Sequence, residues 1–131
     1  MARFSRARIR RYLQDADSAS TAAAQGAQFE ELAAYLFETI PGIHLTARNE
    51  YSAFGTEEID IACRDERAPG GLVSVEFPAI ILIECKNWST PVSSMEIAWF
   101  IMKVWGRGQR FGILIAANGI TGNSRDLNRA N

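Results

Sequence analysis

The sequence has few of the residues on which several common chemistries depend. Its 131 residues include one histidine, His44, and two cysteines, Cys63 and Cys85. One histidine excludes a Ser-His-Asp triad with a second histidine left for a metal, and two cysteines cannot build a disulfide framework. Because both cysteines lie in apolar segments, we expect a reducing, cytoplasmic setting. No run of 18 apolar residues occurs, so we predict no membrane-spanning helix and no membrane partner.

Lysine is also scarce, and the charges are unevenly distributed. The chain has only Lys86 and Lys103 among its 14 basic residues, and the remainder are arginine. Residues 1–14 contain no acid, whereas all 15 acidic residues follow them. A basic arm of this kind can neutralise phosphates, and a solvated, frayed terminus is the alternative. The arginines of this arm, our candidate phosphate contacts, are Arg3, Arg6, Arg8, Arg10 and Arg11.

The apolar residues follow two helical patterns. Between residues 29 and 40 they recur at three- and four-residue steps, which predicts a helix with one buried stripe that ends at Pro41-Gly42. Residues 16–28 are rich in alanine, serine and glutamine and predict a linker that merges into this helix. The sequence Ser93-Ser94-Met95-Glu96 has the form of a capping box and predicts a second helix that extends to about Trp105.

Four further segments have the character of strands. The β-branched run Ile80-Ile81-Leu82-Ile83 predicts a strand buried on both faces. The predicted order is helix, three strands, helix, strand. This order indicates an α/β domain over residues 26–131, preceded by the arm and linker of residues 1–25. Its mixed sheet is antiparallel at the short links and parallel across the helical crossover. The predicted strands are 43–47, 57–63, 80–83 and 111–117, and the polar residues 118–131 are expected to begin another helix.

Two acidic residues occupy positions in strands where acids are unfavourable. Asp60 lies between two isoleucines, and Glu84 follows four consecutive apolar residues. Lys86 is two residues beyond Glu84 and therefore projects from the same face of its strand. If the two strands pair in register, two carboxylates and one amine share a patch. Two buried acids repel each other unless a divalent cation or the ammonium lies between them, so this pattern favours a metal site.

These residues resemble a known family. Ile59-Asp60 and Ile83-Glu84-Cys85-Lys86, with 23 residues between Asp60 and Glu84, resemble the PD-(D/E)xK nuclease superfamily. Residues 55–60, 84–88 and 91–92 are most similar to its Mrr-like restriction endonuclease branch. The resemblance covers residues 26–122 and implies a metal-dependent DNA endonuclease with a restriction-endonuclease-like core, a mixed central sheet flanked by helices. The chain departs from the family at Ile59, where the motif has proline, and it ends soon after the fourth predicted strand.

The resemblance also implies a role for each residue of the motif. Asp60, Glu84 and the backbone carbonyl of Cys85 would bind Mg²⁺, for which Mn²⁺ is a substitute, and Lys86 would serve the water that attacks the phosphate. Glu30 matches the acid of the family's first helix. The alternatives without catalysis are a surface salt bridge between Glu84 and Lys86, a turn-capping role for Asp60, and an exposed helical position for Glu30.

Two other functions compete with the enzyme. One is a catalytically silent DNA-binding module with a nuclease-like fold. The other is an oligomerisation domain, a homodimer formed through the apolar helix of residues 95–105. Arg107 and Arg110 flank a loop after that helix and are further candidate phosphate contacts, with solvated loop arginines as the alternative.

Overall fold

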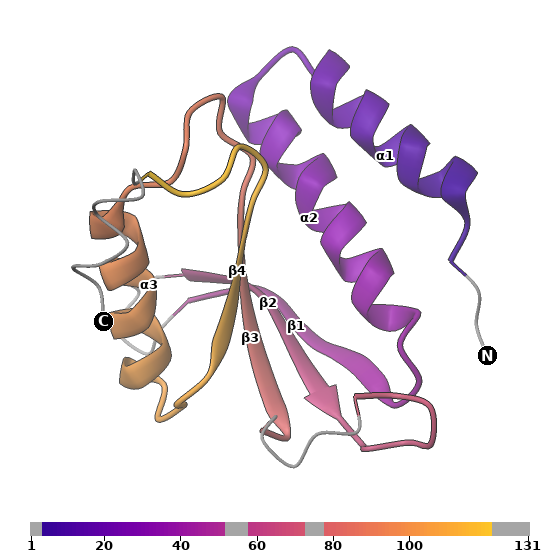
Figure 1. The fold of residues 1–131 in the computed structure, drawn as a ribbon, viewed down its shortest axis with the longest axis vertical. Coiled ribbons are helices and arrows are strands. Elements are labelled where there is room, and N and C mark those ends of the chain that lie inside the picture. The colour runs from indigo at the N-terminus through magenta and orange to yellow at the C-terminus, as the bar shows by residue number, and fades with distance from the viewer. Residues whose placement is uncertain (1–3, 52–57, 73–77, 122–131) are drawn as a thin grey trace.

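The computed structural model of the chain describes residues 4–51, 58–72 and 78–121 (Figure 1). Two helices precede three strands, and a third helix separates the third strand from the fourth. The predicted α/β class is confirmed, with one helix added before the predicted order. The elements are α1 (Arg6–Ser18), α2 (Ala22–Glu38), β1 (Ile43–Tyr51), β2 (Glu58–Asp65), β3 (Ile80–Lys86), α3 (Ser94–Gly106) and β4 (Gly112–Ala116).

The four described strands form one mixed sheet in the order β1-β2-β3-β4. The first three strands are antiparallel, and β3 pairs with β4 in parallel across the α3 crossover, as predicted. β3 is therefore a central strand. The pairing of β2 with β3 runs from Arg64–Ile80 to Ile61–Ile83. It ends one position before Asp60 and Glu84, so the two acids lie where the strands separate.

The face of the sheet toward α2 holds the larger of the two apolar clusters in the described residues. Small side chains on α2 allow this helix to approach the sheet closely. The alternation predicted for β2 holds at positions 61 and 63, which turn toward α2, but not at Ile59, which belongs to the cluster against α3. The buried members of this cluster are Ala33, Ala34, Ile43, Ile61, Cys63, Ile81 and Ile83.

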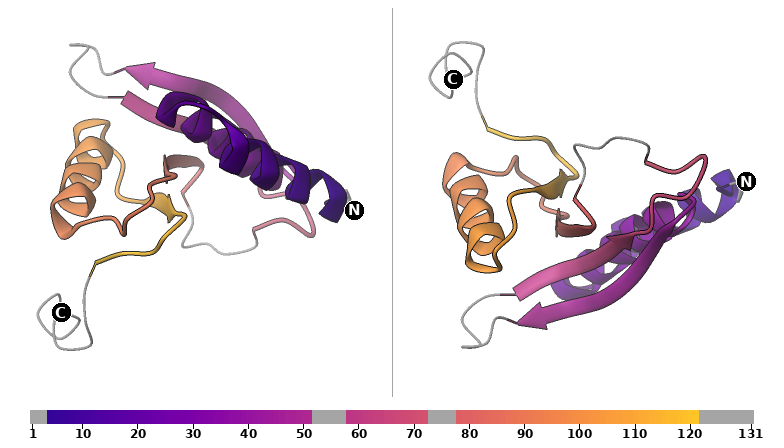
Figure 2. Two further views of the ribbon diagram at one scale, coloured as in Figure 1. Left: turned by 90° about the horizontal axis from the view of Figure 1, so that it is seen from above. Right: turned by 90° about the horizontal axis from the view of Figure 1, so that it is seen from below.

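The opposite face of the sheet packs against α3, which Figure 2 shows on the far side of the sheet from α1 and α2. Its buried cluster joins Ile59 and Leu82 to Phe100 and Val104 of α3. Since side chains alternate along a strand, Glu84 has the same orientation as Leu82, toward α3. The sheet thus directs the Glu84 carboxylate into the layer between β3 and α3.

The N-terminal arm is a helix, and the linker predicted at residues 16–28 is wrong. Only three residues separate the end of α1 at Ser18 from the start of α2 at Ala22. Thr21 caps α2 by accepting a hydrogen bond from the Ala24 N–H. The alanine-rich composition that suggested a linker is also favourable for a helix, and the capping threonine decides the outcome.

α1 lies along α2 (Figures 1 and 2). Contacts at Tyr35 join the two helices. The guanidinium of Arg8 is 4.4 Å from the centre of the Tyr35 ring. The backbone N–H of Ser5 donates to Tyr35 Oη at 2.7 Å, and Ser5 also caps α1. A cation over the face of an aromatic ring is attracted by the negative charge of that face. The arm is therefore attached to the domain rather than frayed.

We predict that Gly112→Ala destabilises the packing of β4 on α3. A Cβ at this position would lie 2.7 Å from Phe100 Cζ and 2.8 Å from Val104 Cγ2, closer than packed carbons approach. Overpacking of this kind costs about 1–3 kcal/mol. Urea unfolding should therefore give a lower midpoint. Gly26→Ala in α2 is the control, because its Cβ meets nothing within 4 Å and alanine favours a helix. A midpoint for Gly112→Ala equal to that of Gly26→Ala would contradict this packing.

Candidate active site

Asp60 and Glu84 come together where β2 and β3 separate. The Cys85 N–H donates a hydrogen bond to Asp60 Oδ2 at 2.7 Å, so the side chain of Asp60 takes the place of a strand partner. Asp60 is half-buried within β2, which excludes the turn-capping alternative. This hydrogen bond brings the Asp60 carboxylate beside the residue that follows Glu84.

Glu84 is the buried charge at the centre of the site. It is 2% exposed, and two lysines donate to the same oxygen, Oε1. Lys86 Nζ lies 2.9 Å from that oxygen and Lys103 Nζ lies 2.8 Å from it. The other oxygen, Oε2, is buried and has no hydrogen-bond partner in the part of the chain that the structure describes. A surface salt bridge between Glu84 and Lys86 is excluded, because the pair lies on a central strand and its carboxylate is out of solvent.

Lys86 is a cation in this site. Burial, the largest single influence, opposes the charged form of its ammonium. The hydrogen bond to Glu84 and the negative charges of Glu84, Asp60 and Glu96 together outweigh burial and raise the pKa of Lys86 above its ordinary value. The side chain is 19% exposed, and its Nζ lies 5.2 Å from the centre of the Trp88 ring. The Lys86 ammonium can therefore attract and orient an anion, whereas it is poorly suited to accept a proton from water.

Glu30 faces this group of charges from α2. Its side chain is 17% exposed, so the exposed-glutamate alternative is excluded. Burial raises the pKa of Glu30 to about 7, with a further contribution from the Asp60 carboxylate. Burial is also the main cause of a raised pKa at Asp60, where the Cys85 N–H lowers it and the Glu84 carboxylate raises it. The three acids are thus close enough to affect one another's charge.

Arg48 of β1 holds the acidic pair on α2. Its Nη2 atom lies 3.1 Å from Glu31 Oε1 and 3.7 Å from Glu30 Oε2. This guanidinium lowers the pKa of Glu30, but less than burial and Asp60 together raise it. Arg48 therefore holds Glu30 near the site, but its charge is not enough to return the pKa of Glu30 to the ordinary value.

The acids at the strand ends have the chemistry of a hard-cation site. Carboxylate and carbonyl oxygens are the ligands that Mg²⁺ prefers, and Mg²⁺ usually binds one or two carboxylates and keeps several waters. The buried Glu84 Oε2, which lacks a donor, fits this requirement. Within residues 4–51, 58–72 and 78–121, no group of three or more histidine, cysteine, aspartate or glutamate side chains is arranged to hold a metal unaided. A cation here would need backbone and water oxygens as well.

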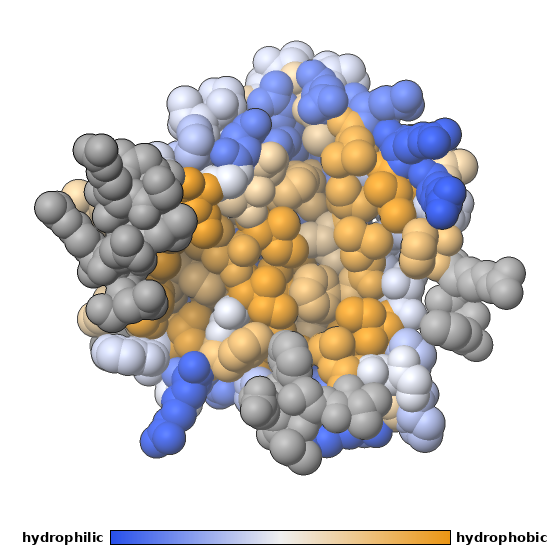
Figure 3. Space-filling view, in the orientation of Figure 1, coloured by the Kyte–Doolittle hydropathy of each residue, from blue (hydrophilic) through white to orange (hydrophobic). Residues whose placement is uncertain are grey.

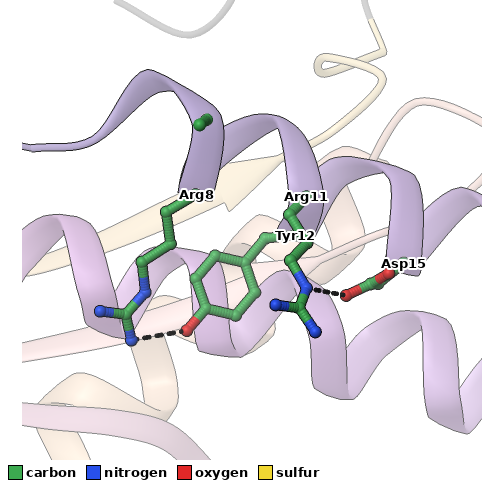
Figure 4. A pocket seen from close by; sticks show the side chains of 5 residues that line it. Arg8, Arg11, Tyr12 and Asp15 are labelled. Atoms are coloured by element: carbon green, nitrogen blue, oxygen red, sulfur yellow. Dashed lines mark hydrogen bonds and ion pairs between the residues drawn. The ribbon is translucent and has the colours of Figure 1, made fainter.

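The candidate phosphate-binding arginines have different surroundings. Arg11 is paired with Asp15 at 3.8 Å, and Arg8 donates to Tyr12 Oη at 3.1 Å. Figure 4 shows these four side chains lining a pocket of about 560 Å³ on α1. Arg6 and Arg10 are exposed on the same helix, and Arg3 lies outside the described residues.

The arginines after α3 also differ from each other. Arg107 is the C-terminal cap residue of α3, and its Nη1 atom donates to the Lys103 carbonyl at 3.3 Å. Arg110 is exposed in the loop before β4. Arg110 therefore stays a predicted phosphate contact, whereas Arg107 contacts the end of the helix.

The outer side of α3 is exposed and apolar. Four large side chains of this helix, Met95, Trp99, Met102 and Trp105, are at least half exposed. Apolar residues also dominate the face of the molecule in Figure 3, between α2 and α3. The homodimer expected from this helix stays a prediction.

The helix expected within residues 118–131 falls mostly outside the described residues. None of the described helices has the length and apolarity to cross a membrane.

Sequence reasoning missed Lys103 as a member of the site. Its side chain is 9% exposed and lies between the buried Phe100 and Val104 on the inner stripe of α3. The spacing 100, 103, 104 was visible in the sequence, and a lysine on an apolar stripe signals a buried partner. Arg48 was also missed, because only the register of β1 brings it to Glu30.

Comparison with known proteins identifies the family. The family model Mrr_cat, described as a restriction endonuclease, matches residues 21–131. No curated protein and no solved structure matches the chain significantly. The matched residues contain every element from the start of α2 onward, including the acids and lysines of the site. The chain therefore belongs to the Mrr-like restriction endonucleases of the PD-(D/E)xK nuclease superfamily.

Proposed function

We propose that the chain is a metal-dependent endonuclease that hydrolyses phosphodiester bonds in DNA. Membership of a nuclease family supports DNA as the substrate. The observation that carries the proposal is the hydrogen bond that brings Asp60 to Cys85, beside Glu84, where β2 and β3 separate, while Glu84 Oε2 is buried and has no donor among the described residues. We assign Asp60, Glu84 and the Cys85 carbonyl as ligands of Mg²⁺, or of Mn²⁺ in its place.

The side chains of the site suit the needs of phosphodiester hydrolysis. A divalent cation bound there would neutralise charge on the phosphate and lower the pKa of water. The Cys85 N–H keeps the Asp60 carboxylate oriented. The Lys86 ammonium, held at 2.9 Å from Glu84, is placed to stabilise negative charge that develops on the phosphate oxygens. Water then forms a bond to phosphorus, one P–O ester bond breaks, and the leaving oxygen is protonated.

We predict that Asp60→Asn, Glu84→Gln and Lys86→Met each reduce Mg²⁺-dependent plasmid cleavage. Each change removes one charge while nearly preserving size, and loss of such a group costs about 10²-fold or more in rate. Gel electrophoresis of supercoiled plasmid, with Mg²⁺ and with EDTA, measures nicking. Asp17→Asn, on the exposed surface of α1, is the control and should cleave at the wild-type rate.

Equal cleavage by the wild type and all three variants would exclude this site. Metal-independent DNA binding by a wild type that never nicks the plasmid would favour the catalytically silent module instead.

Glu30 provides a test in the metal-free protein. Its pKa of about 7 lies above the ordinary value of 4.5, so the folded chain binds more protons than the unfolded chain between these pH values. The carboxylate therefore lowers stability as pH rises through this window. We predict that the free energy of unfolding of Glu30→Gln, relative to that of the wild type, rises by about 1–3 kcal/mol from pH 5 to pH 8. Urea unfolding in EDTA measures this difference.

Glu31→Gln is the matched control for Glu30. It removes the neighbouring acid that also contacts Arg48, but its side chain is 48% exposed. Its stability difference from the wild type should change less with pH. A pH-independent difference for Glu30→Gln would mean that Glu30 does not share the charge environment of Asp60.

The exposed arginines of α1 are proposed to contact DNA phosphates. Arg6 and Arg10 are exposed, whereas Arg8 lies over the Tyr35 ring. Replacing both by glutamine should reduce the slope of log K against log salt by about 1–2. Fluorescence anisotropy of a labelled duplex in EDTA measures this slope. Arg6→Lys with Arg10→Lys preserves the charge and should keep the slope, and an unchanged slope in the glutamine variant would remove α1 from the DNA interface.

A further inference from the structure

Lys103 reaches the site from outside the motif that defines it. It belongs to α3, is 7% exposed as a residue, and donates to Glu84 Oε1 at 2.8 Å. Transfer of an ammonium group out of water costs several kcal/mol unless it is well paired. The burial of Lys103 therefore needs a reason that the apolar packing of α3 does not supply.

The two lysines both donate hydrogen bonds to one oxygen of Glu84, and neither donates to the other oxygen. Lys86 and Lys103 lie 2.9 Å and 2.8 Å from Oε1, whereas Oε2 is buried without a hydrogen-bond partner. A carboxylate that has both donors on one oxygen resists rotation about its terminal torsion. Its second oxygen is left in a fixed position, and a buried acceptor without a donor is costly. A cation at Oε2 would satisfy it.

The two lysines differ in solvent exposure and in the element that holds each side chain. Lys86 is on the same strand as Glu84, is 19% exposed and lies beside Trp88. The side chain of Lys103 is 9% exposed, and its helix is anchored on the sheet through Phe100 and Val104. Lys86 can meet a phosphate from solvent. Lys103 is enclosed on the inner side of Glu84 and is placed to hold the carboxylate.

We propose that Lys103 is a positioning residue that fixes Glu84 so that Oε2 is presented to the divalent cation. This inference rests on the proposed function, because it assigns Glu84 as a metal ligand. The competing interpretation is that Lys103 only attaches α3 to the sheet. A purely structural role would lower stability when Lys103 is lost, but it would not change metal affinity in the molecules that remain folded.

The test compares Lys103→Met with Val104→Ala. Both remove inner contacts of α3, but Val104 belongs to the apolar cluster and has no bond to Glu84. Mn²⁺ binding is measured without DNA by electron paramagnetic resonance of the free ion, and the folded fraction is measured in parallel. We expect Lys103→Met to weaken Mn²⁺ binding at least fivefold and Val104→Ala to stay within twofold of the wild type.

Plasmid cleavage provides a second measurement on the same proteins. Lys103→Met should lower kcat at least tenfold and leave KM for DNA within threefold, because Lys103 orients a ligand rather than binding DNA. If Lys103→Met does not fold, Lys103→Gln is measured against the same limits. Mn²⁺ affinity of the lysine variant within twofold of the wild type, tighter binding, or equal weakening in Val104→Ala would each overturn the proposal.

The two proposals fail in different ways. A wild type that binds Mn²⁺ but leaves DNA intact would end the nuclease assignment, and the Mn²⁺ constants would still decide the role of Lys103. A wild type that binds no Mn²⁺ would overturn both. Weaker Mn²⁺ binding in Lys103→Met alone, with the wild type active, supports both.

Discussion

The site depends on one buried carboxylate, that of Glu84. A charge on a central strand loses most of its water, and the protein replaces that water with two ammonium groups from different layers. One group comes from the strand itself and the other from the helix that covers it. The helix α3 is therefore more than a cover for the sheet, because one of its side chains completes the charge balance of the motif.

The geometry of the sheet explains why the acids meet at this position. Antiparallel pairing of β2 and β3 holds as far as Ile61 and Ile83, and the next positions on both strands are acids. Strands that continued to pair would place two carboxylates directly opposite each other, which is destabilising. Their separation allows Asp60 to accept the Cys85 N–H instead. Repulsion between the two carboxylates and the hydrogen bond from Cys85 to Asp60 thus both favour separation of β2 and β3 at this position.

The sequence predicted the central part of the fold better than its edges. The run Ile80–Ile83 and the alternation in β2 depend on burial, which local pattern reports directly. The helix of the N-terminal arm was not predicted, because Tyr35, which holds it, lies 27 residues beyond Arg8 in the sequence. Asp60, Glu84 and Lys86 were visible as a motif. Lys103 and Arg48 were not, since their partners are set by layer packing and strand register, which no local spacing encodes.

The distribution of the charged groups along the chain has a consequence for assembly. Glu30, Asp60, Glu84 and Lys103 come from four different elements, and the hydrogen bonds between them cross from β2 to β3 and from β3 to α3. No single helix, strand or hairpin contains all four. The charge balance at Glu84 is complete only after the crossover through α3 has closed, so a partly folded chain would contain all the acidic residues without the arrangement that makes them a site.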